Sequence, residues 1–177
     1  MDLRLVKVIP IIFLVVILLM ASISDIRFWK IPNRLTFPAL MAGLVYHTCM
    51  DGWGGLFFSI GGIFLGLALL MTFYLLGGMG AGDVKLMGVV GGILGPEGVF
   101  AAFLATALIG GVYAIILLVL QGETLDMVRR YGTMLKTFLF THQMAYIPPA
   151  KKENRPALRY GVAIALGTLI SVFIKII

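Results

Sequence analysis

The sequence contains little charge and almost no cysteine. Of its 177 residues only 12% are charged, whereas 60% are hydrophobic and the mean hydropathy is +1.05. Soluble domains carry about 25% charged and about 45–50% apolar residues. A soluble core has no room for this excess of apolar side chains, so the composition indicates an integral membrane protein. The single cysteine, Cys49, excludes an intrachain disulfide and a four-cysteine zinc site.

Long apolar runs take the place of charge. A helix of about 20 apolar residues spans the hydrocarbon layer of a bilayer. Six runs predict an all-α polytopic helix bundle with about six transmembrane helices: residues 8–24, 35–50, 56–76, 84–95, 99–120 and 157–177. The fourth run is short and rich in glycine, so we expect it to pack inside the bundle. No linker divides the chain, and we expect a single domain over residues 1–177.

The distribution of lysine and arginine predicts the orientation, because these residues favour cytoplasmic loops. With six alternating helices, one set of loops holds 11 of the 14 basic residues: Arg27, Lys30, Arg34, Lys85, Arg129, Arg130, Lys136, Lys151, Lys152, Arg155 and Arg159. We therefore expect a multi-pass protein of the inner (plasma) membrane with this set inside and both termini outside. The net charge of +6 then reflects topology, and we expect no nucleic-acid partner.

Residues 121–155 are the longest polar stretch of the chain. Apolar side chains recur there at three- and four-residue steps, with basic residues between them. This pattern is typical of an amphipathic helix that lies in the membrane interface and contacts lipid.

Asp25 and Asp83 stand out among the eight acidic residues. Asp25 directly follows the first apolar run and Asp83 opens the fourth, so the predicted topology brings both to one membrane depth on the cytoplasmic side. Ionisable residues at that depth are functional candidates. Two neighbouring carboxylates can hold one proton between them, activate a water and protonate a leaving amine, as an aspartic peptidase requires. The alternative interpretation is that each aspartate only caps a helix.

Four glycines precede the second aspartate: Gly77, Gly78, Gly80 and Gly82. Without side chains, this segment lets helices approach closely and lets the backbone adopt conformations closed to other residues. An extended substrate peptide would meet few clashes against it. We therefore predict that Gly80 and Gly82 contact a substrate.

Several single residues have both a functional and a structural interpretation. Lys85 lies two residues after Asp83 and either orients a substrate carbonyl or extends its ammonium group to the membrane interface. Pro32 and Asn33 together form a turn and cap for the second helix, or Asn33 contacts the substrate backbone. His47 and Cys49 lie at the outer end of the second run, where we expect structural roles.

Two motifs together resemble a known family. The stretch "GAGDVKL", residues 80–86, resembles the Gly-x-Gly-Asp motif of the type IV prepilin peptidase family of membrane aspartic proteases. The stretch "SDIRFWKIPNRLT", residues 24–36, resembles the family's other signature, an aspartate followed by a basic residue and then Ile-Pro-Asn. The stretch "RPALRYGVAIALG", residues 155–167, is similar to the Pro-Tyr-Gly-containing last helix of the small pilus-associated members, except that Arg159 replaces the usual proline.

The resemblance implies that Asp25 and Asp83 are the catalytic pair near the cytoplasmic face, and that the substrate is the leader of a pilin-like precursor. Larger members carry a cytoplasmic insertion with two Cys-x-x-Cys pairs and also methylate the new N-terminus. This chain has one cysteine and only ten residues, 25–34, between its first two helices. We therefore expect cleavage without N-methylation, no metal, and no cofactor such as S-adenosylmethionine.

Two functions of other classes remain open at this point. A small transporter or channel would use the two aspartates as a proton or cation relay, but a relay needs ionisable residues spaced through the membrane. A non-catalytic scaffold for pilus assembly would need neither carboxylate.

Overall fold

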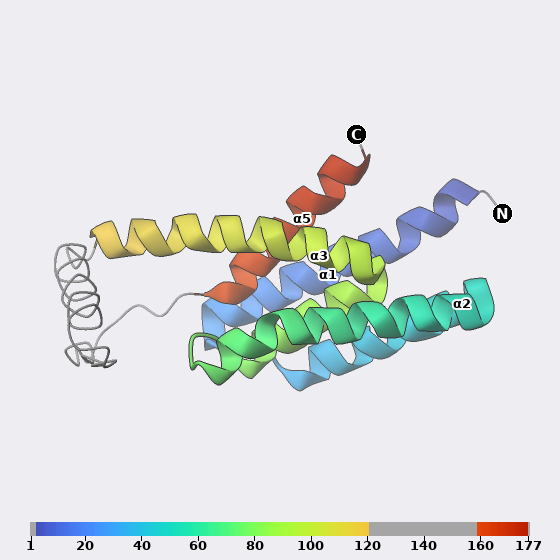
Figure 1. Ribbon diagram of the computed structural model, residues 1–177, viewed down its shortest axis with the longest axis horizontal. Helices are drawn as coiled ribbons and strands as arrows, with labels where there is room; N and C mark the ends of the chain where they lie inside the picture. Colours follow the sequence, from blue (N-terminus) through green and yellow to red (C-terminus); the bar gives the residue numbers. More distant parts are fainter. Residues whose placement is uncertain (1–2, 121–158, 177) are drawn as a thin grey trace, which may run out of the picture. The chain divides into compact units, whose positions relative to one another are not determined.

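The computed structural model describes residues 3–120 and 159–176. These residues form four helices: α1 (Leu3–Phe28), α2 (Asn33–Leu75), α3 (Ala81–Leu120) and α5 (Tyr160–Ile176) (Figure 1). Within those ranges there is no strand, so the all-α prediction is confirmed. The amphipathic helix predicted over 121–155 lies outside the described residues.

The helices α2 and α3 each bend back at a glycine and consist of two helical segments (Figure 1). Gly52 has φ 59° and ψ −133°, and Gly95 has φ 72° and ψ −177°. Positive φ of this kind is readily open only to glycine. The two bends fall between runs 35–50 and 56–76, and between runs 84–95 and 99–120, where the sequence predicted breaks.

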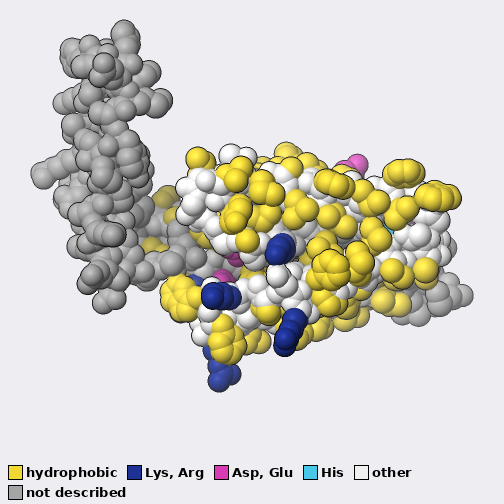
Figure 2. All heavy atoms as spheres, turned by 90° about the horizontal axis from the view of Figure 1, so that it is seen from below, with side chains coloured by type: hydrophobic (Ala, Val, Ile, Leu, Met, Phe, Trp, Pro, Cys, Tyr) yellow, Lys and Arg dark blue, Asp and Glu magenta, His cyan; other side chains and the backbone are white. Residues whose placement is uncertain are grey.

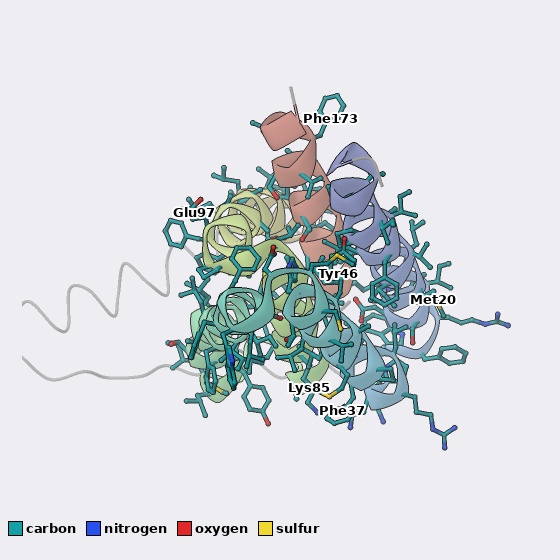
Figure 3. The ribbon with its side chains drawn as sticks, turned by 90° about the vertical axis from the view of Figure 1, so that its right-hand side faces the viewer. Met20, Phe37, Tyr46, Lys85, Glu97 and Phe173 are labelled. Atoms are coloured by element: carbon teal, nitrogen blue, oxygen red, sulfur yellow. The ribbon has the colours of Figure 1, made fainter. Side chains whose placement is uncertain are left out.

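Three helical stretches have the length and apolar composition needed to span a membrane: Val8–Phe28, Asn33–Leu75 and Ala81–Leu117. A fourth stretch, Tyr160–Ile174, is apolar but shorter. Apolar side chains cover much of the surface in Figure 2. Met20, Phe37 and Phe173 point outward from the helices (Figure 3) and are 52%, 64% and 64% exposed. Such a surface fits lipid rather than water, as expected for a helical membrane protein.

The first segment of α3 forms the centre of the hydrophobic core. Leu86, Met87, Val89 and Val90 are all fully buried. This burial confirms the expectation that the fourth apolar run packs inside the bundle. The segment runs antiparallel to the second segment of α2, which returns beside it.

Paired glycines allow this close packing. A Cβ on Gly62 would collide with the carbonyl of Gly91, and a Cβ on Gly91 would collide with the carbonyl of Gly62. Gly66 meets the backbone of Met87 in the same way. Small residues let helix backbones approach within the membrane, where packing rather than the hydrophobic effect drives helix association.

Two side chains of α2 satisfy carbonyls at the bend of α3. Pro96 has no N–H, so the carbonyl of Gly92 lacks its helical partner. The hydroxyl of buried Ser59 donates to that carbonyl over 2.8 Å, and His47 Nε2 donates to the carbonyl of Ile93 over 3.0 Å. Unpaired backbone groups are costly at membrane depth. His47 thus has the structural role expected for it.

The chain divides into two units, residues 1–110 with 159–177 and residues 111–158. The first contains α1, α2, most of α3 and α5, together with all the core described above. Of the second, the structure describes only the end of α3, residues 111–120. The single domain over 1–177 stays a prediction.

Candidate active site

Asp25 lies in the last turn of α1 and is 8% exposed. The helix ends at Phe28, and the N–H of the next residue, Trp29, donates to the Asp25 carbonyl over 3.1 Å. Trp29 has φ 56°, the left-handed conformation that usually falls to glycine after a helix end. A residue with a side chain pays about 1–2 kcal/mol for this conformation. The strain indicates that other contacts hold Trp29 in place.

Asp83 is the third residue of α3 and is also 8% exposed. Its Oδ2 accepts the N–H of Gly80 over 3.1 Å, while its own N–H donates to the Gly80 carbonyl. The first bond is one half of a capping box, in which the third helical residue accepts the N–H of the residue before the helix, and the second is a backbone turn. Asp83 therefore does cap its helix, as the structural alternative held. The cap uses one carboxylate oxygen, so it does not conflict with a chemical role for the other.

Asp25 is held by a residue 136 positions away. The N–H of Gly161, in the first turn of α5, donates to Asp25 Oδ2 over 3.1 Å. Figure 1 shows the start of α5 beside the end of α1. Each aspartate is thus fixed through Oδ2 by the backbone N–H of one glycine. In the described part of the chain, neither Oδ1 atom has a hydrogen-bond partner.

Both aspartates line one cavity of about 650 Å³. The rest of its wall comes from residues 29–33, which follow Asp25, and from residues 80–82 and Lys85, which flank Asp83. The charges of the two aspartates interact electrostatically. The structure therefore brings together two residues 58 positions apart, as the sequence predicted. Among the described residues, no three His, Cys, Asp or Glu side chains are grouped to hold a metal ion.

Lys85 and Asn33 contact each other across the cavity wall. Lys85 Nζ donates to Asn33 Oδ1 over 2.8 Å. The expected cap of α2 at Pro32 and Asn33 is confirmed for Pro32, which is the N-cap, but the Asn33 side chain makes no capping hydrogen bond. Lys85 is half-buried and points to Asn33 rather than only outward to water. The pair joins the segments that follow the two aspartates.

The glycines before Asp83 have roles within the protein itself. A Cβ on Gly82 would lie 2.9 Å from Ile31 Cβ, so the space beside Gly82 is filled by Ile31. A Cβ on Gly80 would lie 3.3 Å from Asp83 Oδ2. Close packing around the aspartate therefore favours glycine at both positions, in line with the close approach that the sequence predicted. Both line the cavity, and their contact with a substrate stays a prediction.

Three residues near Asp25 were missed as site residues by the sequence. The guanidinium of Arg159 lies 4.5 Å from the centre of the Trp29 ring. Arg159 is also close enough to act electrostatically on Asp25, whose carboxylate accepts the N–H of Gly161. The signal in the sequence was the family resemblance alone, which covers Trp29 in residues 24–36 and Arg159 and Gly161 in residues 155–167. The resemblance does not predict which residues α5 contacts.

Two basic residues, Lys30 and Lys85, line the cavity. Figure 2 shows the Lys and Arg side chains gathered toward one end of the described surface. This end holds the linker between α1 and α2, with Arg27, Lys30 and Arg34 on or beside it. Two exposed acidic residues, Asp51 and Glu97, instead adjoin the bends within α2 and α3, away from the helix ends that carry the cavity. On the described surface, the exposed cations therefore lie near the cavity and the exposed acidic residues lie near the bends.

Comparison with known proteins gives one consistent result. Residues 12–115 match the model of the type IV leader peptidase family. Over 108 aligned residues the chain is 34% identical to the prepilin leader peptidase/N-methyltransferase of Bacillus subtilis (strain 168). The aligned region covers 59% of this chain and 42% of that protein. It is 29% identical over 114 residues to a protein of the same name from Aeromonas salmonicida (strain A449), covering 60% and 39%. The chain thus spans about two fifths of the length of these relatives. No solved structure matches.

Proposed function

Because the chain belongs to the type IV leader peptidase family, we propose that it is a membrane aspartic endopeptidase that removes the leader of a pilin-like precursor. The observation that carries the proposal is the shared cavity of Asp25 and Asp83. Each carboxylate is held through one oxygen and leaves the other for chemistry. The two relatives named above are called prepilin leader peptidase/N-methyltransferase, and the cleavage part of that activity is what we propose for this chain.

In the proposed reaction a water lies between Asp25 and Asp83. One carboxylate takes a proton from the water, whose oxygen attacks the scissile carbonyl carbon, while the other, protonated, donates its proton to the carbonyl oxygen. The tetrahedral intermediate then collapses, the C–N bond breaks and the amine leaves with a proton from the pair. The two aspartates titrate as a unit, so neither is assigned a permanent role as base or acid.

The proposed membrane arrangement has six crossings: α1, the two segments of α2, the two segments of α3, and α5. We infer that the cavity faces the cytoplasm, that both termini lie outside, and that the protein is a multi-pass protein of the inner (plasma) membrane. The cations around the cavity support this orientation, because lysine and arginine favour the cytoplasmic side. A leader on a newly made precursor would reach the cavity from that side.

We further infer that cleavage is not followed by N-methylation. Only four residues, 29–32, join α1 to α2, and they line the cavity or flank its helices. A cytoplasmic insertion with two Cys-x-x-Cys pairs has no place there, and the one cysteine, Cys49, lies in α2. The proposed partners are the precursor and membrane lipid, without nucleic acid, metal or another cofactor.

The test is cleavage of a pilin-like precursor, with a basic leader before an apolar helix, in membranes that contain the wild type or a variant. Asp25→Asn and Asp83→Asn should each abolish processing while the protein still inserts. Asp51→Asn, which changes an exposed aspartate beside the bend of α2 at Gly52, is the matched control and should process normally. Processing near the wild-type rate by either active-site variant would contradict the proposal. Mass spectrometry of the product then shows whether its new N-terminus is unmethylated.

A further inference from the structure

The start of α5 contacts Asp25, and the reaction proposed above assigns it no part. The Gly161 N–H that donates to Asp25 Oδ2 belongs to the first turn of α5, where backbone N–H groups have no helical partner. Asp25 supplies that partner in a buried setting. Residues 159–161 lie beyond residues 12–115, which match the family model, so the match gives them no role.

The contact requires glycine at position 161. A Cβ there would lie 2.9 Å from Asp25 Oδ2 and 3.1 Å from Asp25 Cβ. It would also lie 3.1 Å from Ile31 Cδ1, on the far side of the same gap. Any side chain at this position must therefore displace the carboxylate or move α5 away from it.

A second contact ties the start of α5 to the turn after Asp25. Arg159 lies over the Trp29 ring at 4.5 Å, a distance typical of a cation–π interaction. Trp29 in turn donates its N–H to the Asp25 carbonyl. The left-handed backbone of Trp29 directs its ring to this contact instead of continuing the helix. Asp25 is thus held at its carboxylate by Gly161 and at its carbonyl by the residue that Arg159 covers.

We propose that Gly161 and Arg159 are positioning residues of the active site: Gly161 fixes one oxygen of Asp25 so that the other serves the reacting water, and Arg159, stacked on Trp29, holds the start of α5 in place for that bond. This inference rests on the proposed aspartic peptidase function. It makes α5 a necessary support of Asp25 rather than a peripheral membrane anchor, although α5 itself does not line the cavity.

The test measures kcat and KM separately for cleavage of a pilin-like precursor by the purified full-length protein. Gly161→Ala should lower kcat at least tenfold and change KM less than twofold, because the substrate still binds while Asp25 is displaced. Gly54→Ala is the matched control, since a Cβ on this helical glycine meets nothing within 4 Å. Equal kcat for the two variants would overturn the role of Gly161.

Two variants of Arg159 add no atoms beside Asp25. They test the positioning role of the start of α5 even if Gly161→Ala does not accumulate. Arg159→Gln should lower kcat at least fivefold, and Arg159→Lys should recover part of the loss because it keeps a cation over the ring. Wild-type kcat in Arg159→Gln would overturn the role of Arg159. Failure of the wild type to cut, or cutting by Asp25→Asn, would instead refute the peptidase function itself.

A measurement without catalysis tests the hydrogen bond directly. In protein labelled with 15N-glycine, Asp25→Ala should shift the Gly161 amide resonance, whereas Asp51→Ala should leave it in place. An unchanged Gly161 resonance in Asp25→Ala would contradict the positioning role.

Discussion

Lys85 Nζ donates a hydrogen bond of 2.8 Å to Asn33 Oδ1, and the two residues are 52 positions apart. Asn33 opens α2 just after the segment that follows Asp25, and Lys85 lies one half-turn beyond Asp83. The bond therefore joins the two segments that carry the aspartates. Both residues line the cavity without themselves being acids or bases suited to the proposed hydrolysis.

Loss of this bond should reduce cleavage. This bond is exposed and contributes about 0.5–1.5 kcal/mol, so Lys85→Met and Asn33→Ala should each lower kcat/KM by about two- to tenfold. The double variant should be no worse than either single variant, because both remove one interaction. Arg34→Met, an exposed cation beside Asn33, is the control. Additive losses in the double variant would show that the two residues act separately.

Replacing Trp29 separates backbone strain from side-chain contact. Trp29→Gly relieves the positive φ, worth about 1–2 kcal/mol, and removes a cation–π contact worth about 0.5–1 kcal/mol. We expect the thermal stability in detergent to change little and cleavage to fall, since Arg159 loses its support. Trp29→Phe keeps a ring and should retain most of the activity. Faster cleavage by Trp29→Gly than by the wild type would mean that the contact has no positioning role.

The glycine pair between α2 and α3 should be intolerant of any side chain. Gly62→Ala and Gly91→Ala each place a methyl group on a facing carbonyl. Overpacking of a core costs about 1–3 kcal/mol, and more where backbone must move. Both variants should accumulate poorly and unfold at lower temperature in detergent. Gly54→Ala should behave as the wild type, and equal melting temperatures in all three would contradict the close approach.

The bend of α3 should depend on the side chains that satisfy its carbonyls. Ser59→Ala or His47→Ala leaves a buried carbonyl without a donor, and this should destabilise the protein by about 1–3 kcal/mol. Thr48→Val is the control, because its hydroxyl only donates to Leu44 within the same helix. The measurement is thermal unfolding in detergent. A stability loss in the control as large as in Ser59→Ala would argue against a special need at the bend.

The proposed orientation can be tested with single cysteines in a Cys49→Ser background. A membrane-impermeant maleimide added outside intact cells should label Asp51→Cys, which lies at the bend of α2. It should label Arg34→Cys, beside the cavity, only after the membrane is opened. The reverse pattern would place the cavity outside and exclude access from the cytoplasm.

The sequence alone determined the class of protein, the helical runs and the two aspartates. Apolar length is a local property, so the runs and the breaks at Gly52 and Gly95 are visible without a structure. Asp25 and Asp83 were paired correctly because alternating helices return the chain to one face. The burial of the fourth run was predicted from two other local properties, its short length and its glycines.

The tertiary structure decided how each aspartate is held. The bond from Gly161 to Asp25 and the bond from Lys85 to Asn33 join residues 136 and 52 positions apart, and no periodicity records such pairs. The bond in which Asp83 accepts the Gly80 N–H is local, but only the tertiary structure shows that it uses one carboxylate oxygen and leaves the other free. A sequence can place a charged residue at a membrane depth, whereas the packing of helices selects the backbone N–H group that reaches it.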